Sequence, residues 1–232
     1  MKRLGAAEAQ AIGAALDDRG FARVPGLLTA AECRALRALY DDPARFRSRV
    51  VMQRHGFGSG EYQYFADPLP PPVAALRRAF YPLLAPVADR WQERLGRPGR
   101  FPPTLDGYLA QCRAAGQTRP TPLMLKYGPG DFNCLHQDLY GELVFPLQLT
   151  VLLSDPERDF AGGPFLLVEQ RPRQQSRGEA IRLARGEAVI FAVRERPVAG
   201  KRGWYRAALR HGVGTVESGT RFTLGVIFHD AR

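Results

Sequence analysis

From about Pro122 onward the chain alternates apolar and polar residues with a period of two, which constrains the fold more than any other feature. An extended backbone turns successive side chains to opposite faces, so this period indicates strands. Gly-rich turns such as Gly128-Pro129-Gly130 and Gly162-Gly163 separate the runs. Many short strands divided by turns predict a β-sandwich or barrel. The strands expected are Leu123–Tyr127, Phe145–Leu153, Phe165–Gln170, Ala188–Val193, Tyr205–Val213 and Thr220–His229.

The first half of the chain has helical patterns instead. The Ala-rich run Ala6–Arg19 ends at Gly20, a residue that commonly terminates helices. Thr29 with Glu32 three residues later matches a capping box, which predicts a helix from there to about Tyr40. Val73–Leu95 carries apolar residues at helical spacing, and its two internal prolines, Pro82 and Pro86, predict a kink or a break.

The length of 232 residues fits one domain with helices packed on the outside of one β-core, an α+β fold with a mainly β core. We expect residues 1–121 to form a helical N-terminal support and residues 122–232 the core. Residues 47–68, rich in glycine and aromatics, indicate an ordered loop or short hairpin that could contact a substrate.

Several features of the sequence limit where the protein is expected to be located and which partners it is expected to bind. No apolar run approaches the roughly 18 residues that a membrane span requires, and the N-terminus does not look like a signal peptide. Three scattered cysteines fit a reducing compartment, so we expect a cytoplasmic protein. The net charge of +10 favours DNA, RNA or acidic metabolites. It is equally consistent with a general arginine bias, because lysine occurs at only three positions.

Two histidines and one aspartate form a candidate metal group. His136 and Asp138 stand two residues apart, so on an extended backbone both reach the same side. His211 lies in a later predicted strand. Two imidazoles and one carboxylate are the facial ligand set of non-haem Fe(II), which leaves positions open for other ligands.

Arg221 follows His211 by ten residues, inside another predicted strand. Arg221 and Thr223 share one face of that strand, while Phe222 and Leu224 share the other. A guanidinium that points into a barrel requires an anion, and its planar fork suits a carboxylate. The residues therefore predict a metal site and a carboxylate site in one cavity.

This pattern resembles the Fe(II)/2-oxoglutarate-dependent oxygenase superfamily, most strongly over residues 122–230. The stretches 54–65, 116–122 and 133–141 resemble a bacterial subfamily described as oxygenases that act on damaged, alkylated DNA. The resemblance implies a double-stranded β-helix, or jelly roll. It also implies an enzyme that uses Fe(II), 2-oxoglutarate and dioxygen, and for which ascorbate could serve as a reductant. It assigns iron binding and catalysis to His136, Asp138 and His211, and 2-oxoglutarate binding to Arg221, Thr223 and Tyr127.

The resemblance implies hydroxylation, with oxidative demethylation of an alkylated nucleic-acid base as the leading hypothesis. A hydroxylase of peptidyl or free amino-acid side chains, similar to prolyl hydroxylases, is the alternative. A non-enzymatic, cupin-like binding protein is a third hypothesis.

Candidate substrate contacts come from two aromatic segments. The first lies within residues 47–68, where aromatic side chains are expected to stack on a base. The second is formed by rings among the basic loops 171–177 and 194–206, which could contact phosphates. The substrate candidates are His55, Phe57, Tyr62, Tyr64, Trp204 and Tyr205.

Adjacent residues of a strand face opposite ways, so His229 and Asp230 are not expected to bind one metal ion.

Overall fold

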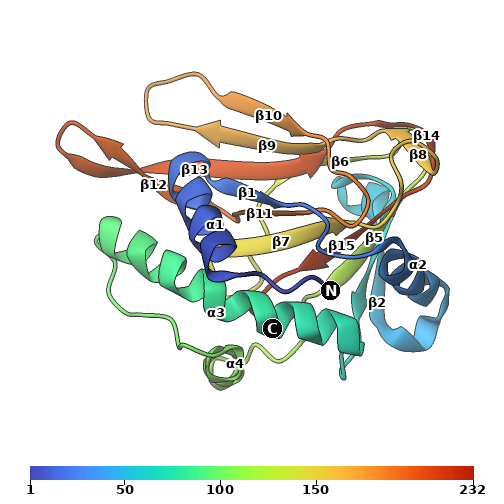
Figure 1. The fold of residues 1–232 in the computed structure, drawn as a ribbon, viewed down its shortest axis with the longest axis horizontal. Helices are drawn as coiled ribbons and strands as arrows, with labels where there is room; N and C mark the ends of the chain where they lie inside the picture. The colour runs from blue at the N-terminus through green and yellow to red at the C-terminus, as the bar shows by residue number, and fades with distance from the viewer.

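The computed structural model describes residues 1–232 and contains two facing antiparallel β-sheets with helices on one side (Figure 1). Every strand pair in these sheets is antiparallel, which is the pairing of a jelly roll. The predicted β-core is thereby confirmed. A further two-stranded sheet, β8 (Phe160–Gly162) with β14 (Val216–Gly219), lies at one end.

The larger sheet has seven strands and includes segments from both halves of the chain. Its central strand β7 is buried along its whole length. The order across the sheet is β1 (Phe21–Val24), β11 (Ala188–Ala192), β7 (Leu147–Leu152), β15 (Arg221–Val226), β5 (Leu123–Tyr127), β4 (Glu61–Phe65) and β2 (Phe46–Val51).

The smaller sheet has six strands, and no helix covers its outer face in Figure 1. Its path begins at an edge hairpin and ends at a two-residue strand. The order is β10 (Arg177–Ile181), β9 (Phe165–Gln170), β13 (Gly203–Val213), β6 (Phe132–His136) and β3 (Gly58–Ser59), and β12 (Glu195–Gly200) pairs with β13.

Helices pack against the larger sheet. Helix α1 (Ala6–Arg19) contacts β1 and β11, and α3 (Pro71–Arg94) contacts β15 and α4 (Leu105–Ala114). Helix α2 (Ala30–Ala38) follows β1, and short 3-10 turns (Leu39–Asp41, Pro43–Arg45 and Met52–His55) connect to the neighbouring strands. None of the helices combines the length and apolarity that crossing a membrane needs.

The predicted helix ends are confirmed. Gly20 adopts the left-handed conformation with φ of 77° at the end of α1, where its N–H donates to the Leu16 carbonyl. The Thr29 side chain accepts from the N–H of Glu32, and the Glu32 carboxylate accepts from the N–H of Thr29. Both bonds satisfy N–H groups that the first turn of a helix leaves unpaired.

Of the kink or break expected at Pro82 and Pro86, the break does not occur: α3 runs continuously for 24 residues. Each proline removes one backbone hydrogen bond from the helix. The face that α3 buries includes Phe80, Leu84 and Trp91, and this burial offsets the loss.

Two segments for which a loop was considered contain paired strands. In the segment 47–68 the hairpin alternative is correct, because β2 pairs with β4 and β4 continues the sheet next to β5. The segment 194–206 was expected to be a loop, but β12 and β13 form a hairpin there, with Val198 opposite Tyr205. Cross-strand pairing satisfies backbone groups that a loop would leave to water.

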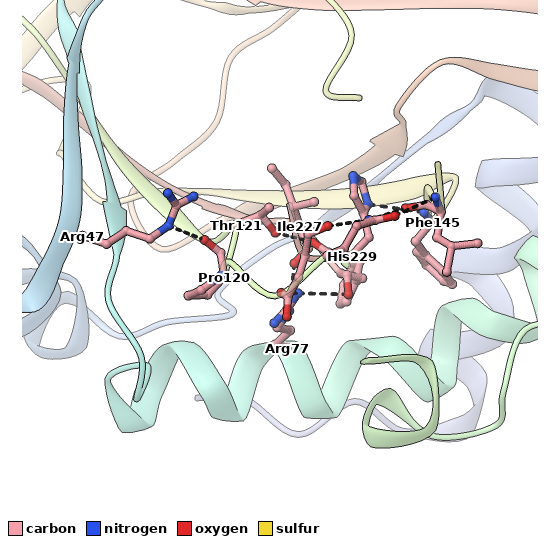
Figure 2. Close-up of polar contacts among 11 residues, drawn as sticks. Arg47, Arg77, Pro120, Thr121, Phe145, Ile227 and His229 are labelled. Carbon is pink, nitrogen blue, oxygen red and sulfur yellow. Dashed lines mark hydrogen bonds and ion pairs between the residues drawn. The ribbon is translucent and has the colours of Figure 1, made fainter. Parts of the chain in front are cut away.

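A hydrogen-bond network anchors the end of the last strand to α3 (Figure 2). Arg77 donates to the carbonyls of Ile227 and Phe228 and forms a buried ion pair with Asp230 at 2.7 Å. The N–H of Phe145 donates to Nδ1 of the buried His229 at 3.3 Å. His229 and Asp230 therefore belong to two separate contacts of this network.

Candidate active site

His136 and His211 are direct cross-strand partners. They are paired in the register of β6 and β13, and their ring centroids lie 4.2 Å apart. Side chains opposite each other in an antiparallel pair point to the same face at close range. The ladder is irregular just beyond this pair, between His211 and Val213. The pairing of two strands distant in sequence thus brings the two imidazoles together.

Asp138 completes the group from the loop that follows β6. Its Oδ1 lies 3.5 Å from Nε2 of His136, and its Oδ2 lies 3.2 Å from Nε2 of His211. One donor atom from each residue lies within 4.8 Å of the other two. The sequence prediction that these three side chains meet is confirmed in space.

The hydrogen bonds around the group suit metal binding. Nδ1 of His136 lies 2.7 Å from the carbonyl oxygen of Cys134. If Nδ1 carries the proton and donates to this carbonyl, Nε2 keeps a lone pair that can bind a metal ion. Nε2 is also the nitrogen on the side of Asp138. Nδ1 of His211 is buried without a partner. Two imidazoles and a carboxylate around one point fit a divalent iron ion.

Charge interactions within the group favour an ionised Asp138. Burial opposes its ionisation, but contacts with His136 and His211 hold the pKa of the carboxyl well below 3.8. Burial also lowers the pKa of His211, although Asp138 opposes this shift. For His136, contacts with Asp138 outweigh the effect of burial and raise the pKa above 6.5. These contacts thus favour the ionised form of Asp138 in the folded protein.

Two residues that the sequence analysis did not single out hold Asp138. The Tyr140 hydroxyl donates to Oδ1 at 2.7 Å, and Nε2 of Gln148 donates to Oδ2 at 2.8 Å. The sequence did carry a signal for Gln148. Gln148 and Thr150 are polar residues on one face of the buried strand β7, and a polar face inside a core indicates a cavity.

Arg221 is buried without an acidic partner. It lies at the start of β15, opposite Tyr127 on β5, and is 2% exposed. Its Nη1 donates to Oγ1 of Thr223 at a long 3.5 Å, and its Nε has no partner. Burial lowers the pKa of Arg221 to about 10, and no carboxylate opposes this shift. A cation held in this state requires an anion from outside the chain.

One cavity of about 340 Å³ joins the two sets of residues. The candidate metal group enters it from the smaller sheet and the following loop, and the Arg221 group enters it from the larger sheet. This volume is in the range of small-molecule sites. The predicted site residues that line it are His136, Asp138, His211, Arg221, Thr223 and Tyr127.

The candidate substrate residues divide into two sets. Phe57 and Tyr62 line the cavity, and Phe57 is 47% exposed with His55 stacked on it at 5.3 Å. Tyr64 is buried behind Tyr62, with ring centroids 5.4 Å apart.

The structure does not bring the other two candidates, Trp204 and Tyr205, to the cavity. Trp204 is exposed and packs on the guanidinium of Arg94 at 4.3 Å, outside the lining, and Tyr205 lies beside it on β13. The hairpin that carries both rings extends away from the site, because its β12 partner pairs at the far end of β13 (Figure 1).

Comparisons with known proteins agree with this geometry. The chain matches the Oxygenase-NA family over residues 60–231, and this family is described as "Oxygenase, catalysing oxidative methylation of damaged DNA". Proteins from two Mycobacterium tuberculosis strains, both named as uncharacterised, are each 56% identical over 167 residues, which is 72% of either chain.

Solved structures share the fold at low sequence identity. The epimerase SnoN from nogalamycin biosynthesis, described as non-haem and α-ketoglutarate-dependent, aligns with a TM-score of 0.59 at 15% identity. That alignment covers 95% of this chain and 82% of SnoN. A 2OG-Fe(II) oxygenase family protein from Burkholderia pseudomallei aligns with a TM-score of 0.55 at 16% identity, over 99% and 96% of the two chains.

A family match over most of the chain shows membership, and the structural likenesses show the fold. The expectation of an enzyme is thereby confirmed over that of a binding protein. The chain belongs to the Oxygenase-NA family of oxygenases, and it has the jelly-roll fold and the His-Asp-His group of an Fe(II)/2-oxoglutarate-dependent enzyme.

Proposed function

We propose that this oxygenase hydroxylates the alkyl group of an alkylated nucleic-acid base and thereby demethylates it. His136, Asp138 and His211 would hold Fe(II), and Arg221 would bind a carboxylate of 2-oxoglutarate. The observation that best supports the proposal is that one cavity is lined both by a set of possible metal ligands and by the buried guanidinium of Arg221, which has no acidic partner.

The residues around Arg221 suit a dicarboxylate. The fork of the guanidinium binds a carboxylate through two parallel hydrogen bonds, and burial strengthens such a pair. Thr223 stands beside Arg221, and Tyr127 faces it from the neighbouring strand. Both hydroxyl groups would donate to the same anion, since each can rotate its hydrogen. Binding of 2-oxoglutarate would thus neutralise the unpaired charge of Arg221.

When bound, Fe(II) with 2-oxoglutarate and dioxygen supplies the oxidant that hydroxylates a substrate C–H bond. The chain's own contribution is to place the reactants and to limit water in the cavity. Hydroxylation of an N-methyl group gives an unstable carbinol, which loses formaldehyde and restores the base. The oxygenated carbon therefore leaves as a product that can be measured.

The substrate class follows from the family description and from the cavity mouth. Phe57 and Tyr62 offer rings on which a base taken out of its stack would pack. The net charge of +10 favours a polyanion. The amino-acid alternative has support as well, since the exposed Phe57 and Leu135 give the mouth an apolar character that also suits an aliphatic side chain.

A turnover experiment distinguishes the two substrates. The protein with Fe(II), 2-oxoglutarate and oxygen is incubated with methylated oligonucleotides, unmodified oligonucleotides, peptides or free amino acids. We expect succinate and formaldehyde in equal amounts with methylated DNA or RNA, and a steep loss of rate with added salt because phosphate contacts release counterions. Succinate without formaldehyde, on a peptide or amino acid alone, would support the alternative.

A further inference from the structure

Each oxygen of Asp138 accepts a hydrogen bond from a different part of the fold, and we propose that Tyr140 and Gln148 are positioning residues that fix this carboxylate for metal binding. The inference rests on the proposed function, because it takes His136, Asp138 and His211 as the metal ligands. It concerns two side chains that do not belong to the ligand set themselves.

Tyr140 approaches from the same loop as Asp138. Its hydroxyl lies 2.7 Å from Oδ1, and its ring packs edge-on against Tyr64 with centroids 6.0 Å apart. Tyr64 is itself held between Tyr62 and the guanidinium of Arg47, which lies 4.5 Å from the Tyr64 ring. A ring packed in this way keeps one orientation, so the hydroxyl stays directed at the carboxylate.

Gln148 approaches from β7, in the sheet opposite the two histidines. Its Nε2 lies 2.8 Å from Oδ2 of Asp138 and 3.3 Å from Nε2 of His211. An ionised carboxylate only accepts hydrogen bonds, so the amide must present its NH₂ group to Asp138. Gln148 is the one residue of the larger sheet that is hydrogen bonded to any of the three ligands, and it contacts Asp138 and His211. Arg221 lies on that same sheet.

The unpaired end of the amide indicates that this contact is not made for stability. Oε1 of Gln148 is buried and has no donor. An unsatisfied buried acceptor costs about 1–3 kcal/mol. An apolar side chain on the buried strand β7 would avoid that cost. What such a side chain could not supply is the N–H donor that holds Oδ2.

The two donors together restrict how Asp138 can move. With Oδ1 bonded to Tyr140 and Oδ2 bonded to Gln148, rotation of the carboxylate breaks at least one bond. Partners that orient a ligand typically contribute 10- to 100-fold to metal affinity. The geometry therefore assigns to Tyr140 and Gln148 a direct effect on the affinity for the metal ion.

Metal titration of the full-length, metal-free protein tests this assignment. Co(II) binding is followed by its absorption spectrum, and Fe(II) binding by anaerobic equilibrium dialysis. We expect Tyr140→Phe and Gln148→Met each to weaken binding by about 10- to 100-fold. The double variant should lose less than the product of the two effects, because both donors act on one carboxylate.

Two matched variants control for a general loss of packing. Tyr81→Phe removes a tyrosine hydroxyl that donates to the Pro102 carbonyl at 2.9 Å, and Gln63→Met removes a buried amide that donates to the Tyr40 carbonyl at 3.0 Å. These are the same substitutions at positions outside the cavity lining. We expect them to lower the melting temperature without a change in metal affinity.

The outcomes separate this inference from the proposed function. Metal affinities within twofold of wild type in both Tyr140→Phe and Gln148→Met would overturn the inference alone. Absence of Co(II) and Fe(II) binding by the wild-type protein would overturn the proposed metal centre and the inference with it. Tyr140→Phe removes a single oxygen atom, so it decides the question by itself if Gln148→Met does not fold.

Discussion

The two sheets contribute to the cavity in opposite ways. The smaller sheet and its following loop supply His136, Asp138 and His211, whose polar atoms already contact one another. The larger sheet supplies Arg221, which is fully buried and has no charged partner. The smaller sheet thus presents a cluster of nitrogen and oxygen atoms that can bind a metal ion, and the larger sheet presents a guanidinium cation that has no anion beside it. The two sides therefore suit two different ligands, a cation at the first and an anion at the second.

This difference explains why the site lies between the sheets. Cross-strand pairing alone brings the two histidines together, because their positions are fixed by the register of β6 and β13. Arg221 is placed by β15, which pairs with β5 and β7 and has no strand contact with the smaller sheet. Only the packing of one sheet on the other places Arg221 near the His-Asp-His group.

The largest effect is expected on the smaller sheet. His136→Ala removes one of three metal ligands, so Fe(II) binding should weaken by more than about 100-fold and turnover should fall to background. Dialysis against Fe(II) and succinate formation measure the two effects. If His136→Ala kept wild-type turnover, the metal group assigned here would be wrong.

A smaller effect with a different signature is expected on the larger sheet. Arg221→Met should raise the dissociation constant of 2-oxoglutarate by about 100-fold, because one partner of a buried charge pair is lost. Fe(II) affinity should stay unchanged. The ligand-free variant should also melt at a higher temperature than wild type, since an unpaired buried charge is removed. Calorimetric titration and thermal unfolding check both, and an unchanged affinity for 2-oxoglutarate would refute the role of Arg221.

The mouth of the cavity should contribute less than either sheet. Phe57→Ala removes an exposed ring that lines the cavity, so we expect about tenfold weaker binding of a methylated oligonucleotide, the value of one base–aromatic stack. Fluorescence anisotropy measures the affinity. Trp204→Ala, an exposed ring outside the cavity, is the control and should bind as wild type does. Equal losses in both variants would contradict a specific role for Phe57.

His229 should make the stability of the fold depend on pH. Burial lowers its pKa from 6.5 to about 4, so the unfolded chain binds a proton that the folded protein does not. The protein therefore loses stability as the pH falls from about 6.5 towards 4, by about 2–3 kcal/mol at pH 4.5. His229→Gln should remove this loss, as measured by urea unfolding at several pH values. Identical pH profiles for variant and wild type would contradict this.

Much of the fold could be predicted from local signals in the sequence. The capping box at Thr29 and the strands β7, β9 and β15 are predicted from neighbouring residues, and the structure confirms them. The continuity of α3 through Pro82 and Pro86 could not be predicted, because it depends on contacts with a distant core. Strand β12 was missed for the same reason, because it becomes evident only through its pairing with β13, most of which was predicted as the strand Tyr205–Val213.

The site shows the same division. The spacing of His136 and Asp138 and the chemistry of an inward arginine predicted that these side chains, His211 and Arg221 meet in one cavity, and the structure brings them together there. Tyr140 and Gln148 were missed because their role depends on which atom each side chain contacts across the cavity. Trp204 and Tyr205 were placed near the substrate on composition alone, and the direction of the β12–β13 hairpin excludes them from the cavity.

The account's central claim is that the two sheets supply two linked halves of one site. Anaerobic titration of 2-oxoglutarate into the Fe(II)-loaded protein tests it most directly. We predict one equivalent bound tightly to wild type, with binding weakened in His136→Ala through the metal and in Arg221→Met through the carboxylate. Binding of 2-oxoglutarate that is indifferent to both substitutions would contradict the claim.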